Sequence, residues 1–270
     1  MKIVSGGVSD VGRVRTNNED SFQILDSQHL FVLSDGMGGG AHGEVASAIA
    51  VQTVVKCCTE AQEDADATVL DVVSDTFSEK TKRLQNALRQ ANLNIFESAQ
   101  KNPEQRGMGA TLTAVWAGPD KLSIAHVGDS RAYLLRMGSL QQLTSDHSLV
   151  AEQVRRGIIT PQQAEESENQ SVLLRAMGAN PNVEVDADEV GTYPGDILLL
   201  CSDGLTRMVT EPEIAGTLQA ETRPSSAAQK LVDLANERGG MDNITVIVVR
   251  FQEEAKSWFS WFRRGAAKKD

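Results

Sequence analysis

Four aspartates along this 270-residue chain have the neighbours expected of a carboxylate that takes part in chemistry. Asp35 and Asp203 are each followed by glycine, Asp129 is preceded by one, and Asp242 is followed by asparagine. Asp35, Asp203 and Asp242 lie next to short apolar runs that we expect to be strands. A carboxylate at the end of a buried strand is held on a rigid element.

Carboxylates brought together repel one another unless cations neutralise them. Hard divalent cations such as Mg²⁺ and Mn²⁺ prefer oxygen ligands, and a glycine beside a ligand lets a backbone carbonyl approach the ion. Two such ions can activate a water for attack on phosphorus. A single Asp-Gly pair is more often a turn. Four acidic motifs at strand boundaries together favour a metal site.

The order and spacing of the motifs resemble those of the metal-dependent protein phosphatase family, protein phosphatase 2C type, in its compact bacterial form. The similarity extends from about Ser5 to Phe251. Each motif is weak singly, and the ordered set is specific. The motifs are Arg15-Thr16-Asn17-Asn18-Glu19-Asp20, Asp35-Gly36-Met37-Gly38-Gly39, Gly109-Ala110-Thr111, Gly128-Asp129-Ser130-Arg131, Ser202-Asp203-Gly204 and Asp242-Asn243.

The resemblance implies two core metal ions, Mg²⁺ or Mn²⁺, and a weaker third. Asp35, Asp203 and Asp242 would bind the first ion. Asp35 and the carbonyl of Gly36 would bind the second, and Asp129 with Asp203 would form the third site.

Residues near the first two motifs are implied to handle water and phosphate. By the resemblance, Glu19 would hold metal-bound water and Arg15 would grip the substrate phosphate, for which a planar guanidinium is suited. Met37 stands where some family members carry a histidine, and methionine cannot transfer a proton. We hypothesise that His42, in the glycine-rich loop, reaches the leaving oxygen directly or through water. The alternative is a surface histidine without a role.

The implied activity is hydrolysis of phosphoserine and phosphothreonine in proteins by metal-activated water, opposing a bacterial Ser/Thr kinase. Arg15, Asp35 and Asp203 are the expected catalytic residues, and Arg15 and His42 the substrate-binding ones. The alternative is a catalytically inactive phosphoprotein-binding scaffold of the same fold. Such relatives usually lose a metal aspartate, whereas this chain keeps all four.

The composition restricts the class of protein. With 26 basic and 37 acidic residues the net charge is −11, which argues against nucleic-acid binding. Three cysteines give no disulfide framework and fit a reducing compartment. We find neither a signal-peptide pattern nor an apolar stretch of membrane-spanning length, and expect a cytoplasmic monomer.

Short strands in hairpin-like groups, with helices between the groups, favour mainly antiparallel sheets. Lys121–Val127 and Arg131–Arg136 are expected to form a hairpin, and Ser225 to cap a helix that ends before Gly239. Leu84, Leu88, Ala91 and Ile95 form one apolar stripe of another helix. With the resemblance, we expect an α+β fold, a four-layer α-β-β-α sandwich of two mainly antiparallel sheets flanked by helices.

We divide the chain into a catalytic domain, residues 1–251, and a basic aromatic tail, residues 252–270. Within the domain, residues 149–178 resemble the family's flap. Its Arg155, Arg156 and Arg175 could guide acidic phosphosegments or simply be solvated charges. The tail could anchor on an anionic membrane, dock on a partner, or pack as a terminal helix.

Overall fold

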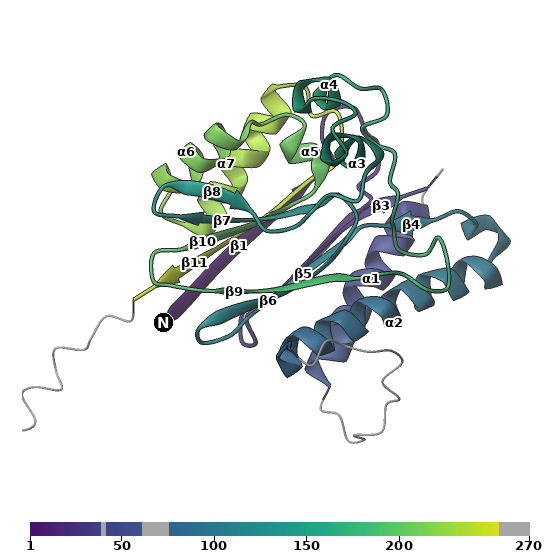
Figure 1. Ribbon diagram of the computed structural model, residues 1–270, viewed down its shortest axis with the longest axis horizontal. Helices are drawn as coiled ribbons and strands as arrows, with labels where there is room; N and C mark the ends of the chain where they lie inside the picture. Colours follow the sequence, from purple (N-terminus) through teal and green to yellow (C-terminus); the bar gives the residue numbers. More distant parts are fainter. Residues whose placement is uncertain (39–41, 61–75, 254–270) are drawn as a thin grey trace, which may run out of the picture.

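The computed structural model describes residues 1–38, 42–60 and 76–253, and these form a sandwich of two sheets with helices on both outer faces (Figure 1). One sheet has the order β1 (Lys2–Asp10), β11 (Ile244–Gln252), β10 (Ile197–Cys201), β7 (Arg131–Arg136) and β8 (Ser139–Gln142). The other has the order β2 (Asp20–Leu25), β3 (Leu30–Met37), β5 (Leu112–Ala117), β6 (Lys121–Val127) and β9 (Asp186–Gly191), and β4 (Gly109–Ala110) pairs with β3. Each of these strand pairs is antiparallel.

Two long helices, α1 (His42–Thr59) and α2 (Glu79–Lys101), cover the β2–β9 sheet. Helices α6 (Glu211–Ala220) and α7 (Pro224–Glu237) cover the β1–β8 sheet. The short elements are η1 (Pro103–Gln105), α3 (Leu149–Arg155), α4 (Pro161–Glu165) and α5 (Asp203–Thr206). The expected α+β four-layer sandwich is therefore confirmed.

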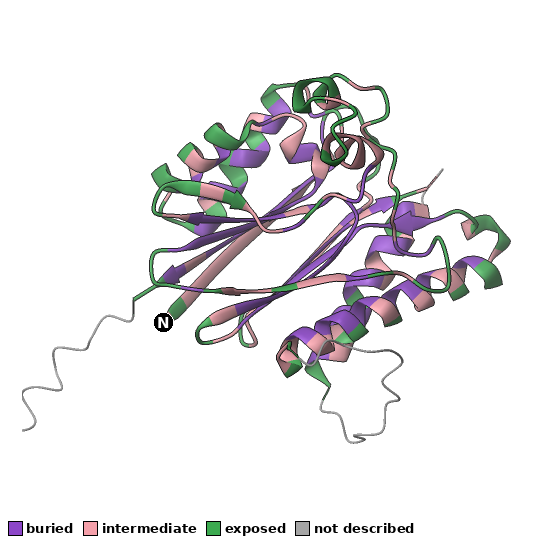
Figure 2. Ribbon diagram, viewed as in Figure 1, coloured by how far each residue is buried: buried purple, intermediate pink, exposed green. Residues whose placement is uncertain are grey.

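The alternation of side chains along the central strands explains the layers. The strands between the helical layers are largely buried (Figure 2). In β11, Val246 and Val248 pack toward α7, whereas Ile247 and Val249 face the other sheet. A strand buried on both faces reads as a continuous apolar run, as β11 does. The stripe on α2 is fully buried as expected, with Leu84, Leu88, Ala91 and Ile95 each 0% exposed.

The expected hairpin between β6 and β7 is wrong. β6 pairs with β5 and β9 in one sheet, and β7 pairs with β10 and β8 in the other. Residues 128–130 therefore cross from one sheet to the other, and Gly128 takes a φ of +114° there. This crossing places Asp129 between the two sheets at one edge of the sandwich.

One smaller detail also differs from expectation. Helix α7 begins at Pro224, with Arg223 rather than Ser225 at the N-cap position, because proline fits the first turn of a helix. The flap region contains the short helices α3 and α4, and its two ends meet where Ser148 bridges Leu173. The proposed domain boundaries stay a prediction, and almost all of the tail lies outside the described residues.

Helix α2 is fixed at its start by Glu189 of β9. The Glu189 carboxylate accepts the backbone N–H of the N-cap residue Ser78 (2.8 Å), the Thr81 hydroxyl (2.5 Å) and the Lys121 ammonium (2.6 Å). Burial raises the pKa of Glu189, but these donors outweigh it and lower the pKa to about 2. The ionised form therefore ties α2 to the edge of its sheet.

We expect Glu189→Gln to lower the free energy of unfolding by about 2 kcal/mol at neutral pH, because it removes hydrogen bonds to a charged acceptor. Since the folded pKa is depressed, this contribution is present above the unfolded pKa and is lost as the pH falls toward about 2. Denaturant unfolding of both proteins from pH 7 to pH 3 measures the difference. The exposed Glu237→Gln is the matched control, and a Glu189→Gln deficit that does not shrink on acidification would contradict this account.

Candidate active site

The four aspartates of the sequence motifs lie at one edge of the sandwich, where strand ends from both sheets meet. Asp35 lies near the end of β3, Asp203 follows β10 and opens α5, and Asp242 precedes β11. Asp129 lies in the crossing between β6 and β7. Antiparallel pairing brings the end of β10 and the start of β11 to the same edge, with Cys201 opposite Val246.

Burial and mutual repulsion raise the pKa values of this cluster. The pKa of Asp35 lies well above its usual range because the group is buried and because Asp20, Asp203, Asp129 and Asp242 add negative charge. The pKa of Asp203 is raised by burial and by Asp242, and its carboxyl hydrogen-bonds Asp35. Burial, and then Asp203, raise the pKa of Asp129 to about 7. The protein groups around these aspartates therefore do not fully stabilise their negative charge.

Two arginines offset part of this charge. Arg207 pairs with Asp203 (2.5 Å), and Arg15 pairs with Asp242 (2.9 Å). Within the described residues, the remaining N–H groups of the half-exposed Arg15 have no protein partner. Arg15 therefore has donors available to an anion beside the aspartates.

The donor set suits a hard divalent cation. The converging groups are carboxylates. In addition, the buried oxygen Oδ1 of Asp20 has no hydrogen-bond partner in the described part of the chain. In residues 1–38, 42–60 and 76–253, no three His, Cys, Asp or Glu side chains already surround a common point as in a formed metal site. A cation at this edge would compete with Arg15 and Arg207 for oxygens of Asp242 and Asp203.

Glycines let the backbone of β3 approach the start of α1. A Cβ on Gly36 would lie 2.1 Å from the carbonyl oxygen of Gly43, and a Cβ on Gly43 would lie 2.6 Å from the Glu19 carboxylate. The Gly36 N–H also donates to the Glu19 carbonyl (3.1 Å). Burial raises the pKa of Glu19, whereas Arg15 and His42 lower it.

Asn243 fixes the loop that carries Arg15 and Glu19. Its side-chain oxygen accepts the Glu19 N–H (2.8 Å), and its amide donates to the carbonyls of Val11 (3.0 Å) and Asn17 (2.9 Å). All eight predicted site residues thus lie at this edge: Arg15, Glu19, Asp35, Gly36, His42, Asp129, Asp203 and Asp242. We assigned no role to Asn243 from the sequence, although it follows Asp242 in a motif.

Sequence reasoning also gave no role to Asp20, the first residue of β2. Asp20 is 8% exposed, pairs in register with Asp35, and accepts the hydroxyls of Ser202 (2.8 Å) and Thr245 (2.6 Å). Burial raises its pKa to about 7 although both hydroxyls lower it. The adjacent acidic pair Glu19-Asp20 suggests that one of the two carboxylates belongs to the site. Which of the two is buried depends on the register of β2 against β3.

We expect Asp20→Asn to raise the melting temperature in EDTA by about 2–4 °C, because one buried like charge is removed. The same change should lower metal-dependent hydrolysis by about 10- to 100-fold, as loss of a group behind a metal ligand does. Thermal unfolding and p-nitrophenyl phosphate turnover measure the two effects. Asp120→Asn, at an exposed turn, is the control. A lower melting temperature in EDTA would contradict the repulsion account.

A groove of about 1120 Å³ leads away from the aspartates between the flap and the start of α6. Asp129 and Asp203 line its inner end. Apolar side chains of α3 and the α5–α6 segment, such as Val150, Val154 and Val209, line its walls. The groove is therefore continuous with the aspartate cluster and partly apolar.

The arginines of the flap are engaged in ion pairs. Arg155 and Arg156 both pair with Glu152, and Arg175 pairs with Glu184 and Asp186. Besides Asp129, three acidic residues of the groove have no ion pair within the described residues, namely Glu165, Glu166 and Glu211. The outer end of the groove is therefore acidic.

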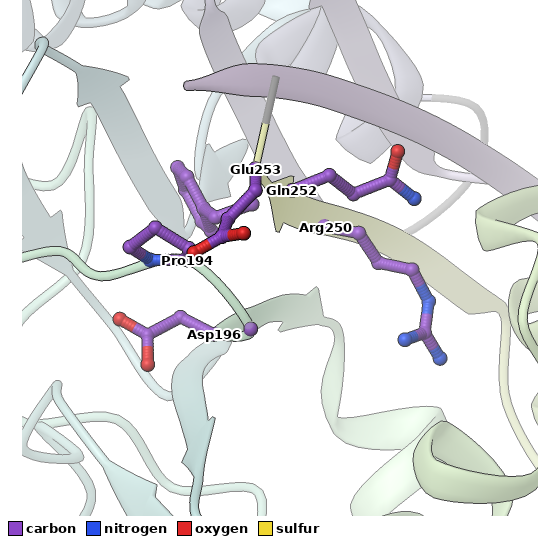
Figure 3. Close-up of a pocket in the computed structure, with 7 residues that line it drawn as sticks. Pro194, Asp196, Arg250, Gln252 and Glu253 are labelled. Atoms are coloured by element: carbon purple, nitrogen blue, oxygen red, sulfur yellow. The ribbon is translucent and has the colours of Figure 1, made fainter. Parts of the chain in front are cut away.

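A second pocket, of about 410 Å³, lies at the opposite ends of β10 and β11 (Figure 3). Asp196 in this pocket pairs with Arg136 (2.7 Å), and Arg250 donates to the carbonyls of Leu218 and Glu221. Since these charged groups hold the structure together, we assign the pocket no chemistry.

The fold agrees with comparisons to known proteins. The family model described as Protein phosphatase 2C matches residues 12–237. This chain belongs to the protein phosphatase 2C family.

Named relatives match over most of the chain. The Listeria monocytogenes serine/threonine phosphatase stp is 39% identical over 244 residues, which cover 89% of this chain and 93% of the relative. The Mycobacterium tuberculosis serine/threonine protein phosphatase PstP is 38% identical over 240 residues, covering 89% of this chain and 43% of PstP.

Solved structures match equally well. The M. tuberculosis serine/threonine phosphatase PstP/Ppp superimposes with a TM-score of 0.82 at 35% identity, over 94% of this chain and 100% of that structure. The PstP catalytic domain in complex with two manganese ions gives a TM-score of 0.79 at 35% identity, over 93% of this chain and 99% of that structure. The resemblance noted from the motifs is confirmed.

Proposed function

We propose that this chain is a metal-dependent protein serine/threonine phosphatase whose reaction takes place at the aspartate edge. The observation that carries the proposal is the convergence of Asp35, Asp203, Asp242 and Asp129, with Arg15 beside them. Relatives named serine/threonine phosphatases, at 35–39% identity over most of the chain, support phosphorylated proteins as substrates.

The proposed roles are those that the family resemblance implies, and the oxygen donors are compatible with them. Asp35, Asp203 and Asp242 would bind one cation, and Asp35 with the Gly36 carbonyl would bind a second. Divalent cations bound there supply Lewis acidity and activate water for attack on phosphorus. Asp129 with Asp203 forms a weaker third position. The manganese ions of the PstP complex support two core positions, and the choice of Mg²⁺ or Mn²⁺ in the cell is decided by availability.

Side chains around the aspartates bind and orient the substrate. The free donors of the Arg15 guanidinium bind phosphate oxygens, and Arg15 stays oriented by its pair with Asp242. Glu19 accepts hydrogen bonds from water beside the cations. His42, at the first turn of α1 and near Glu19, protonates the leaving oxygen directly or through water.

The rival hypothesis, an inactive phosphoprotein-binding scaffold, has no support in the site. All four aspartates are present, and none of the named relatives is described as inactive. Turnover in one metal-dependent assay separates the two.

Asp35→Asn and Asp203→Asn should each abolish Mn²⁺-dependent hydrolysis of p-nitrophenyl phosphate, lowering kcat by at least about 1000-fold, because each removes a carboxylate that holds the cations. Circular dichroism verifies that the variants fold, and Asp120→Asn should keep wild-type turnover. Near-normal turnover in either variant would disprove the metal assignment.

His42→Ala tests the leaving-group role. With phenyl phosphate, whose leaving group is poor, we expect kcat to fall about 100-fold and the limb of the pH–rate profile that belongs to the general acid to disappear. With p-nitrophenyl phosphate, whose leaving group needs little protonation, the loss should be small. A phenyl phosphate profile unchanged from wild type would remove His42 from the mechanism.

The groove supports a preference among phosphoproteins. Because the flap arginines are paired and Glu165, Glu166 and Glu211 are not, we propose that the chain flanking the phosphoresidue carries basic side chains. The apolar walls accept an aliphatic residue between them. The ion pairs of Arg155, Arg156 and Arg175 weigh against a role for these arginines in guiding acidic phosphosegments.

A matched pair of phosphothreonine peptides, with arginine or glutamate flanks, tests this preference. We expect kcat/KM to favour the basic peptide, and the double change Glu165→Lys/Glu166→Lys to shift the ratio about fivefold toward the acidic peptide. The double change Asp120→Lys/Glu237→Lys, the same charge change at exposed positions outside the groove, is the control. A ratio unmoved by the double change, with p-nitrophenyl phosphate turnover intact, would contradict the groove assignment.

We further propose a cytoplasmic monomer that opposes a Ser/Thr kinase. Among the described helices none is both long and apolar enough to cross a bilayer. Sedimentation velocity tests the monomer, fractionation tests the location, and phosphoproteomics of a deletion strain tests the kinase relationship. For the tail, residues 252–270, liposome co-sedimentation with and without it tests membrane binding. A dimer would contradict the monomer, membrane-bound protein would contradict the cytoplasmic location, and an unchanged phosphoproteome would contradict the kinase relationship.

A further inference from the structure

Two histidines hold the Gly128 peptide that directly precedes Asp129. The backbone N–H of His147 donates to the Gly128 carbonyl (2.8 Å), and the Gly128 N–H donates to Nδ1 of His147 (3.0 Å). Nε2 of His126 lies 3.0 Å from the same carbonyl. A Cβ on Gly128 would lie 2.6 Å from Cβ of Thr111, so there is no room for a side chain at this position.

These contacts determine the tautomer of His147. Since Nδ1 accepts the Gly128 N–H, the ring proton is on Nε2, which donates to the Asp186 carboxylate (3.1 Å). Burial lowers the pKa of His147, Asp186 opposes this, and Arg175 adds to it. The ring, 4% exposed, is a neutral imidazole with both nitrogens engaged.

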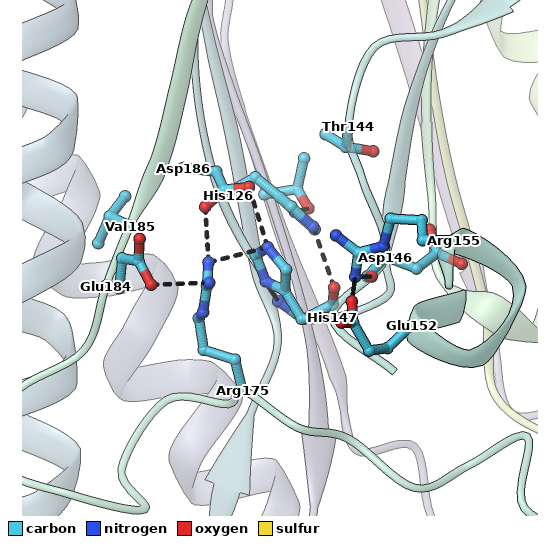
Figure 4. Close-up of polar contacts among 12 residues, drawn as sticks. His126, Thr144, Asp146, His147, Glu152, Arg155, Arg175, Glu184, Val185 and Asp186 are labelled. Carbon is cyan, nitrogen blue, oxygen red and sulfur yellow. Dashed lines mark hydrogen bonds and ion pairs between the residues drawn. The ribbon is translucent and has the colours of Figure 1, made fainter. Parts of the chain in front are cut away.

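His147 also lies where the two ends of the flap meet. Its carbonyl accepts the N–H of Leu174 (2.8 Å), at the returning end of the flap. Nη1 of Arg175 lies 3.0 Å from Nε2 of His147, but since Nε2 carries the ring proton both atoms are donors, and both donate to the Asp186 carboxylate. Arg175 thus donates to Asp186 (2.6 Å) and Glu184 (2.8 Å), as Figure 4 shows. One residue thus contacts both the base of the flap and the peptide that carries Asp129.

We propose that His147 is a positioning residue that orients Asp129 through the Gly128 peptide, and that Arg175 and Asp186 hold it in place at the base of the flap. The importance of Asp129 rests on the proposed function, whereas the His147–Gly128 contact does not. The link from His147 to Asp129 follows from the crossing between the two sheets.

Two substitutions separate the two nitrogens of His147. In His147→Asn the amide oxygen takes the place of Nδ1, so the bond from the Gly128 N–H is kept and the link to Asp186 is lost. In His147→Gln the amide reaches the place of Nε2, so the Asp186 link is kept and the Gly128 bond is lost. The pair is matched in chemistry and opposite in the contact that each retains.

A readout without metal tests the contact itself. In EDTA, the Gly128 amide should exchange with deuterium about tenfold faster in His147→Gln than in wild type, and within about threefold of wild type in His147→Asn. Nitrogen-15 shifts of the wild-type ring should give a protonated Nε2 and an unprotonated Nδ1. Equal exchange in the two variants, or the opposite tautomer, would overturn the proposal.

Metal dependence tests the consequence. The Mn²⁺ concentration for half-maximal p-nitrophenyl phosphate turnover should rise about tenfold in His147→Gln and stay near wild type in His147→Asn. In an Asp129→Asn background His147→Gln should add no further shift. The positioning role would be overturned if Mn²⁺-dependent turnover fell in both variants alike, in proportion to the fall in their melting temperatures. Absence of turnover in the wild type would instead defeat the proposed function and leave the exchange result standing.

Discussion

Repulsion among buried carboxylates is the constraint on which this structure depends. Asp20 and Asp129 are buried at one edge of the sandwich, Asp35 and Asp203 are partly buried there, and each of the four has a raised pKa. Hydroxyls of Ser202 and Thr245 and the guanidiniums of Arg15 and Arg207 offset only part of the cost. Folding nevertheless holds the carboxylates together, because each lies on or beside a strand whose other residues form the core. A cation at this edge is the natural counter-charge, and it explains how an acidic protein could bind an anionic substrate.

The edge can be this crowded because glycines replace side chains where strand ends meet. A Cβ on Gly204 would lie 2.0 Å from the carbonyl oxygen of Asn243, much as Gly36 meets Gly43. These close approaches bring the backbones bearing Asp203 and Asp242 together, and Asn243 in turn ties down the loop of Arg15 and Glu19. The crossing at Gly128 adds Asp129 from between the sheets, with His126 and His147 holding its peptide. The site is thus assembled by backbone contacts as much as by charges.

Local patterns predicted the parts of this fold that depend on local physics. Apolar periodicity identified helix α2 and the buried strands, and acidic residues beside glycine or asparagine identified the four aspartates. The pairing of β6 and β7 was predicted wrongly, because a glycine-rich segment between two strands reads the same whether they pair or cross to another sheet. The burial of Asp20 rather than Glu19, and the pairing of the flap arginines with acidic neighbours, depend on register and tertiary contacts. No single-sequence pattern carries that information.

The central claim is that Asp35 is shared by two cations at the edge of the sandwich. Calorimetric titration of Mn²⁺ into the wild type and into Asp35→Asn and Asp242→Asn variants tests it most directly, because stoichiometry distinguishes a shared ligand from an unshared one. We predict that the wild type binds at least two ions per chain, that Asp242→Asn weakens one, and that Asp35→Asn loses both. Binding of the same number of ions by Asp35→Asn and the wild type would contradict the account.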